Sequence, residues 1–125
     1  DNVMLKINPD TGDIVPVLID FGLSKHYDKN GKPTSTVRVS GFSDGYAPVE
    51  QYTGIYTFTP QADVYALAAT LYYALVGKDP IIASELTRNT ILRNLPNVIS
   101  ESVKNAISAG MRMRKEERLQ NVGEL

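Results

Sequence analysis

Residues 59–77 read TPQADVYALAATLYYALVG, and this stretch decides which kind of fold the chain can form. Apolar side chains recur in it with the 3.6-residue period of an α-helix, at Val64, Leu67, Ala68, Leu71, Tyr72 and Leu75. Thr59 can cap this helix, Pro60 suits its first position, and Gly77 is suited to end it. Because the helix is apolar nearly all round, we expect it to lie buried at the centre of a domain.

Further helices are expected on the C-terminal side of this stretch. Residues 84–95 carry a weaker helical pattern, which Pro96 ends. Ser100 can cap another helix, and one stripe of that helix carries Val103, Ile107 and Met111. Residues 122–125 have the pattern of the start of a last helix.

The N-terminal side has a different pattern. Apolar side chains alternate over residues 3–7, a turn-forming stretch follows at 8–12, and residues 14–19 form a second β-branched run. These features predict a β-hairpin. From residue 20 to residue 59 the periodicity is lost among glycines and prolines, and residues 24–40 are polar. The fold class expected is therefore mainly α with a small β-hairpin.

Composition excludes several classes of protein. The 125 residues carry 13 basic and 14 acidic side chains, so no basic excess indicates binding to nucleic acid or to an anionic membrane surface. No apolar run reaches the roughly 20 residues that a membrane-spanning helix needs. The absence of cysteine excludes disulfides and thiolate metal sites and fits a reducing compartment, so a cytoplasmic location is expected.

The order of the motifs is more informative than any one of them. A strand is followed by Asp20-Phe21-Gly22, a long polar loop, Ala47-Pro48-Val49-Glu50 and a buried helix. This order resembles the protein kinase family over nearly the whole chain. The resemblance implies one partial domain, a kinase-like large lobe that is incomplete at both ends. Residues 1–19 would close the catalytic loop and form the hairpin, 20–50 would be the activation segment, and 51–125 the helical subdomain.

The resemblance implies a nucleotide and metal site at the hairpin. Asn2 stands where the family has a magnesium-binding asparagine, and Asp20 where it has a metal-binding carboxylate. Oxygen atoms of both types suit a hard cation. Met4 stands where the family packs an apolar side chain under the nucleotide base. Each residue also has a structural alternative: Asn2 could be a turn asparagine, Asp20 a loop acid or helix cap, and Met4 an ordinary strand residue.

The activation segment carries several further candidates. Phe21 would pack inward, and Gly22 would allow backbone angles closed to other residues. Ser43 stands where the family has a threonine that hydrogen-bonds the catalytic aspartate, and residues 43–51 resemble bacterial serine/threonine kinases. Candidate phosphorylation sites, which could equally be unmodified polar loop residues, are Thr34, Ser35, Thr36 and Ser40.

Two structural interactions are also implied by the resemblance. Glu50 would pair with a buried arginine, for which Arg118 is the candidate; the alternative is two solvated surface charges. Asp63 would hydrogen-bond catalytic-loop amides, and it also suits the first turn of a helix as an anion. Tyr65 stands where the family usually has tryptophan and Ala68 where it usually has glycine, which puts packing details in doubt.

The function that the resemblance implies is phosphorylation of protein Ser or Thr with ATP and Mg²⁺. The family's catalytic Asp and phosphate-binding Lys would lie upstream of Asp1, so the chain alone is expected to be inactive. Its expected partners are a protein substrate and the missing N-terminal lobe. Apolar surface left uncovered would favour self-association or marginal stability. The alternative functions are a pseudokinase and a truncated lobe that acts as an interaction module.

Overall fold

The structure, a computed structural model, describes residues 2–20, 43–52 and 59–125. The chain divides into two compact units, Asp1–Val39 and Ser40–Leu125. The boundary between them lies within the range 20–50 that the sequence predicts to be an activation segment.

The first unit contains the predicted β-hairpin. Strands β1 (Val3–Ile7) and β2 (Ile14–Leu18) pair antiparallel, in a register that opposes Val3 to Leu18 and Ile7 to Ile14. The turn is closed by Asn8, whose N–H donates to the Asp13 carbonyl at 2.8 Å and whose own carbonyl accepts from the Gly12 N–H. Gly12 has φ +76°, a left-handed conformation that glycine adopts at little cost.

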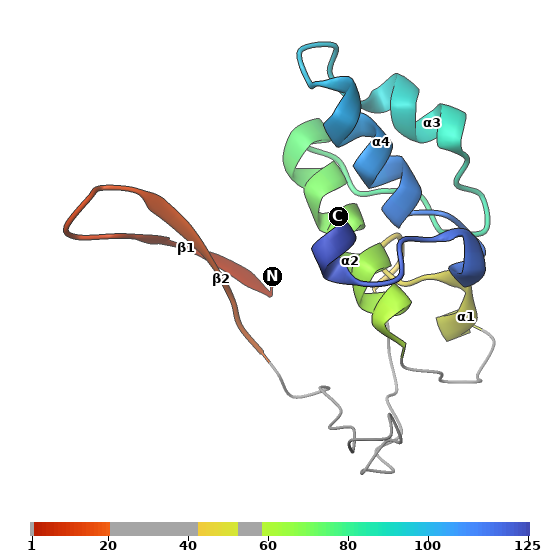
Figure 1. Cartoon of the computed structure of the whole chain (residues 1–125), viewed down its shortest axis with the longest axis horizontal. Coiled ribbons are helices and arrows are strands. Elements are labelled where there is room, and N and C mark those ends of the chain that lie inside the picture. The colour runs from red at the N-terminus through yellow and green to blue at the C-terminus, as the bar shows by residue number, and fades with distance from the viewer. Residues whose placement is uncertain (1, 21–42, 53–58) are drawn as a thin grey trace, which may run out of the picture. The chain divides into compact units, whose positions relative to one another are not determined.

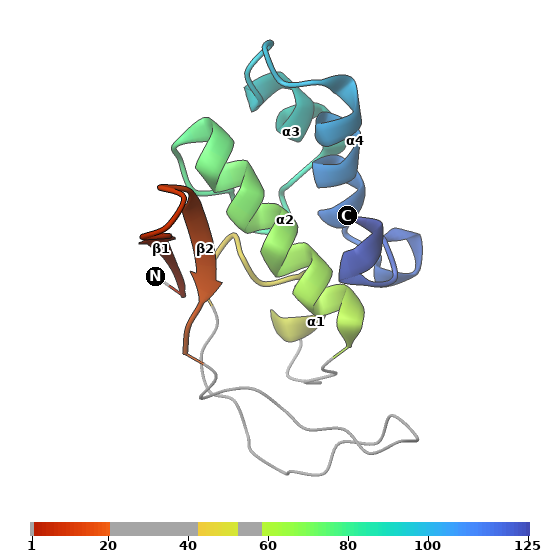
Figure 2. The same ribbon diagram turned by 60° about the vertical axis from the view of Figure 1, so that its left-hand side comes forward.

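The second unit is helical (Figures 1 and 2). Its elements are α1 (Val49–Tyr52), α2 (Pro60–Val76), α3 (Arg88–Asn94), α4 (Glu101–Gly110) and the short 3₁₀ turns η1 (Lys115–Glu117) and η2 (Val122–Glu124). Helix α2 packs against α4 and η2, and α3 packs against α4. The core between them is made by Tyr65, Ala68, Ala69, Tyr72, Ala83, Leu86, Ile91, Leu95, Ile107 and Met111.

Small side chains allow α2 and α4 to approach closely. A Cβ atom added to Gly110 of α4 would lie 2.7 Å from the Cβ of Ala68 on α2 and 3.1 Å from Leu125. The Ala68 position, where the family usually has glycine, is therefore at the point of closest packing. A larger residue at either position would push the two helices apart.

The helix ends confirm some predictions and correct others. Gly77 ends α2 at φ +73°, and the Ser100 side chain caps α4 by accepting from the Val103 N–H at 3.5 Å. Thr59 stands at the N-cap of α2 but makes no capping hydrogen bond with its side chain. Helix α3 begins only at Arg88, and not at Ser84, because Thr87 caps it: its hydroxyl accepts from the Thr90 N–H at 3.1 Å.

The expectation that the central helix is buried on all sides is wrong in part. Val64, Tyr65 and Ala68 are fully buried, but Leu67 and Leu71 are 36% and 40% exposed. The packing of α2 therefore covers one face of an apolar helix and leaves an apolar stripe open. In the described part of the chain, no helix is both long and apolar enough to cross a membrane.

Candidate functional site

The hairpin brings Asn2 and Asp20 to the same end of the first unit. The Ile19 N–H donates to the Asn2 carbonyl at 2.8 Å, which extends the ladder one pair beyond Val3 and Leu18. Asp20 follows directly, and its backbone turns there with φ +63°, a conformation uncommon for a residue other than glycine. The two side chains that could supply oxygen ligands to a cation thus begin from neighbouring backbone positions.

Of the other candidate site residues within residues 1–42, the structure describes Met4 but not those that follow Asp20. Met4 lies on β1 opposite Val17 and is 57% exposed, so an apolar ligand could reach it. Phe21, Gly22 and the four candidate phosphorylation sites lie outside the described residues.

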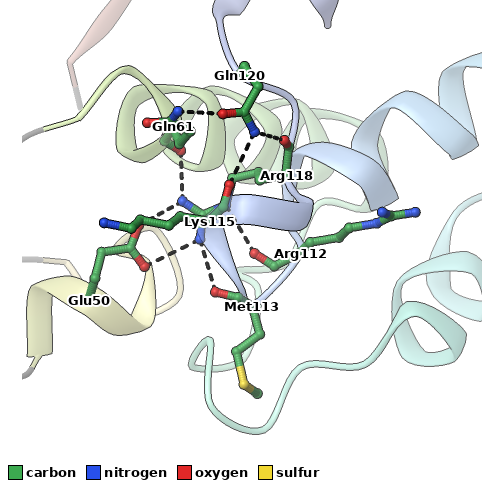
Figure 3. Close-up of polar contacts among 7 residues, drawn as sticks. All are labelled: Glu50, Gln61, Arg112, Met113, Lys115, Arg118 and Gln120. Carbon is green, nitrogen blue, oxygen red and sulfur yellow. Dashed lines mark hydrogen bonds and ion pairs between the residues drawn. The ribbon is translucent and has the colours of Figure 1, made fainter.

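Arg118 occupies the most densely hydrogen-bonded position of the second unit (Figure 3). Its side chain is fully buried, and Nη1 donates to Glu50 Oε1 at 2.8 Å while Nη2 donates to Glu50 Oε2 at 3.3 Å. The remaining N–H groups donate to three backbone carbonyls, those of Gln61, Met113 and Arg112, at 2.8, 3.1 and 3.0 Å. The ion pair predicted between Glu50 and Arg118 is therefore present, and all five guanidinium donors are used.

The sequence did not indicate the surroundings of this ion pair. The Tyr65 ring lies under the guanidinium, with its centroid 5.2 Å from Cζ, which is a cation–π distance. The Tyr65 hydroxyl is buried without a hydrogen-bond partner among the described residues, and burial raises its pKa to about 12. Gln120 links Gln61 to the backbone of Arg118: its Nε2 donates to the Arg118 carbonyl, and its Oε1 accepts from Gln61 Nε2. The one sequence feature that could have indicated the contact between Tyr65 and Arg118 is that Tyr65 stands where the family usually has tryptophan.

Residues 43–48 are held against the loop that follows α2. The Ser43 carbonyl accepts from the N–H groups of Tyr46 and Ala47, at 3.0 and 3.2 Å, and this forms a tight turn. The Tyr46 hydroxyl then donates to Asp79 Oδ1 at 2.6 Å. Burial raises the pKa of the Tyr46 phenol, and the hydrogen bond to Asp79 raises it further. Ser43 itself is exposed.

Asp63 lies in the first turn of α2, as predicted. It keeps access to water, yet the surrounding protein removes part of the hydration of its carboxylate, and this desolvation raises its pKa. No described residue donates a hydrogen bond to this carboxylate. Asp63 therefore carries a charge that is partly desolvated and that the described residues leave without a hydrogen-bond donor.

We expect Asp63→Asn to leave the stability of the chain at pH 7 unchanged or higher. The pKa of this carboxyl is higher in the folded than in the unfolded chain, so its protonated form stabilises the folded state. That contribution to stability is lost as the pH rises through the pKa of the folded state. At pH 7 the charge therefore opposes folding, and near pH 3 parent and variant should differ little. The measurement is the free energy of unfolding in urea at both pH values.

Glu101→Gln provides the matched control for this experiment. Glu101 is also a first-turn acid, on α4, but it is exposed and pairs with Lys104 at 3.0 Å. Its replacement should lower stability at pH 7 by a few tenths of a kcal/mol. A loss of more than about 1 kcal/mol for Asp63→Asn at pH 7 would show that desolvation is outweighed by interactions of the charged form.

Comparison with known proteins agrees with this architecture. The chain is 35% identical, over 85 residues, to the serine/threonine-protein kinase PknA of Nostoc sp. (strain PCC 7120); the match covers 64% of this chain and 14% of PknA. It also matches the solved structure of the apo form of PpkA-294 with a TM-score of 0.65 and 26% identity, over 99% of this chain and 42% of that one. No protein-family model matches the chain.

The fold and the motifs together define a kinase-like fragment. Its architecture, mainly helical with a two-stranded antiparallel sheet, is that of a protein-kinase-like large lobe. Its sequence is homologous to part of a bacterial serine/threonine kinase. The chain spans less than half the length of each of these two relatives.

Proposed function

We propose that this chain is part of an ATP-dependent serine/threonine protein kinase that transfers the γ-phosphate of ATP to protein substrates. The observation that carries the proposal is the backbone pairing of Asn2 with Ile19, which places Asn2 and Asp20 at one end of the hairpin. In this reading the Asn2 amide oxygen and the Asp20 carboxylate hold Mg²⁺ bound to the nucleotide phosphates. Met4 would contact the base.

The geometry of Asp20 supports a positioned carboxylate. A positive φ is uncommon at residues other than glycine, although aspartate adopts it more readily than most, and strained backbone conformations cluster at functional sites. Local strain of this kind turns the side chain away from the direction that a regular strand would give it. We infer that this turn directs the carboxylate toward the metal that Asn2 also binds.

The state of Asp63 also supports the proposal. Backbone N–H groups are strong donors, and a carboxylate that accepts two or three of them is stabilised in its charged form. Asp63 has a partly desolvated carboxylate with no such donor among the described residues. In the proposed kinase, amides of the catalytic loop would supply these hydrogen bonds and reverse the direction of the pKa shift.

Activity of the intact kinase tests the proposal. In a full-length protein that contains this segment, Asp20→Asn and Asn2→Ala should each lower kcat/KM for phosphate transfer to a generic acceptor such as casein. The loss should exceed about 100-fold, because even residues that only orient a metal ligand are worth 10–100-fold. The 125-residue chain assayed alone should transfer nothing.

Asp13→Asn is the control in that assay. Asp13 is also an exposed acid of the hairpin, but it lies at the opposite end, beside the turn. It should retain full activity. Equal activity of Asp13→Asn and Asp20→Asn would refute the proposed metal site. Nucleotide binding without any transfer would instead favour a pseudokinase.

A further inference from the structure

A hollow with a mixed polar and apolar lining lies between the C-terminal end of α2 and α3. It has a volume of about 380 Å³, within the usual range of ligand sites in proteins. Its polar lining consists of Tyr72, Lys78, Asp79, Thr90 and Asn94, and Val76 and Ile81 complete it. All these residues belong to the second unit.

Most of the polar groups in the hollow already have partners within the protein. Asn94 Nδ2 donates to the Tyr72 hydroxyl at 2.9 Å, and Asp79 Oδ1 accepts from the Tyr46 hydroxyl. Lys78 differs from them: within residues 2–20, 43–52 and 59–125, no carboxylate lies within 4 Å of its ammonium group. The hollow therefore offers a cation that an incoming anionic side chain can pair with.

Two contacts connect the hollow to residues 43–48, part of the stretch 43–51 whose sequence resembles the substrate-docking end of the activation segment in bacterial serine/threonine kinases. Tyr46 reaches Asp79 through the 2.6 Å hydrogen bond, and Gly45 lies directly against Pro80. A Cβ at Gly45 would come within 2.2 Å of the Pro80 carbonyl oxygen, so the two backbones touch. A peptide bound along residues 43–48 would thus lie beside the loop that carries Lys78.

We propose that this hollow receives an acidic side chain of the protein substrate and that Lys78 selects it. The inference rests on the proposed kinase function and adds a substrate class to it. Asp79 serves as a positioning residue, because its carboxylate is engaged by Tyr46 and holds the docking segment in place. Lys78 then supplies the charge that distinguishes an acidic from a neutral or basic substrate residue.

A peptide array tests the proposal with the full-length kinase. Each peptide carries one Ser or Thr acceptor, with Glu, Lys or Ala placed in turn at every flanking position. One flanking position should prefer Glu over Ala by about three- to fivefold in kcat/KM, the size expected of an exposed ion pair. Lys78→Met should abolish that preference through KM with kcat unchanged, and Lys78→Glu should transfer it to Lys.

The controls separate this inference from the proposed function. Lys104→Met replaces a lysine of α4 that is absent from the lining of the hollow, and it should keep the preference for Glu. Transfer to all peptides without a Glu preference would overturn the inference and leave the kinase function intact. If no peptide is phosphorylated, fluorescence polarisation can still measure the binding of labelled Glu peptides to the kinase. If Lys78→Glu weakens the binding of the Glu peptides, the proposed docking in the hollow is supported. If the substitution leaves their binding unchanged, the inference is overturned.

Discussion

Replacing Arg118 with methionine should lower the free energy of unfolding by about 3–5 kcal/mol. This is the usual cost of removing one partner of a buried ion pair, because the charge of the other partner is then no longer compensated. Methionine keeps an unbranched apolar side chain, although a shorter one, and removes every donor. The Glu50 carboxylate and the carbonyls of Gln61, Arg112 and Met113 would all lose the hydrogen bonds that Arg118 donates to them. Equilibrium unfolding of the 125-residue chain in urea, followed by circular dichroism, measures the loss.

A second variant and a control make this prediction decisive. Glu50→Gln removes the charge but keeps an acceptor oxygen, so it should cost less than Arg118→Met. If Arg118→Met does not fold at all, Arg118→Lys, which keeps the charge and loses the forked donors, should still show a large loss. Arg114→Met should change stability by less than about 1 kcal/mol, since Arg114 is 78% exposed and lies 3.9 Å from Glu117. Equal losses for Arg114→Met and Arg118→Met would contradict the buried network.

Replacing Gly45 with alanine should have the second largest effect, a loss of about 2–5 kcal/mol in the free energy of unfolding. About 1–2 kcal/mol comes from placing a Cβ at φ +80°, and a further 1–3 from its overlap with the backbone. The atom it would meet is the Pro80 carbonyl oxygen, at 2.2 Å, which cannot rotate away as a flexible side chain would. Relief requires residues 43–48 to move away from the loop after α2.

Gly77→Ala isolates the steric part of this cost. Gly77 has φ +73°, nearly the same as Gly45, but nothing lies within 4 Å of an added Cβ. It should therefore lose only the conformational part, about 1–2 kcal/mol. The difference between the two variants in urea unfolding measures the contact with Pro80. If both variants lose the same stability, the two backbones do not touch as the structure shows.

The sequence by itself determined the elements whose signals are local. The alternation at residues 3–7 and the turn after it predicted the hairpin, and the 3.6-residue period predicted the helix at 60–76 with its end at Gly77. These signals depend on neighbours within a few residues, so they can be read without knowing the rest of the fold. The pairing of Asn2 with Ile19 was seen only in the structure, since the sequence predicted the hairpin but not its register.

The tertiary structure alone decided what depends on residues far apart in the chain. The Glu50–Arg118 pair spans 68 positions and could be predicted only from a family resemblance, which did not reveal the Tyr65 ring or the three carbonyls. The Tyr46–Asp79 hydrogen bond spans 33 positions and left no periodic signal. Burial of one face of α2 and desolvation of Asp63 were likewise invisible, because they depend on which surfaces pack together. Packing is a property of the assembled chain, and no local pattern of residues encodes it.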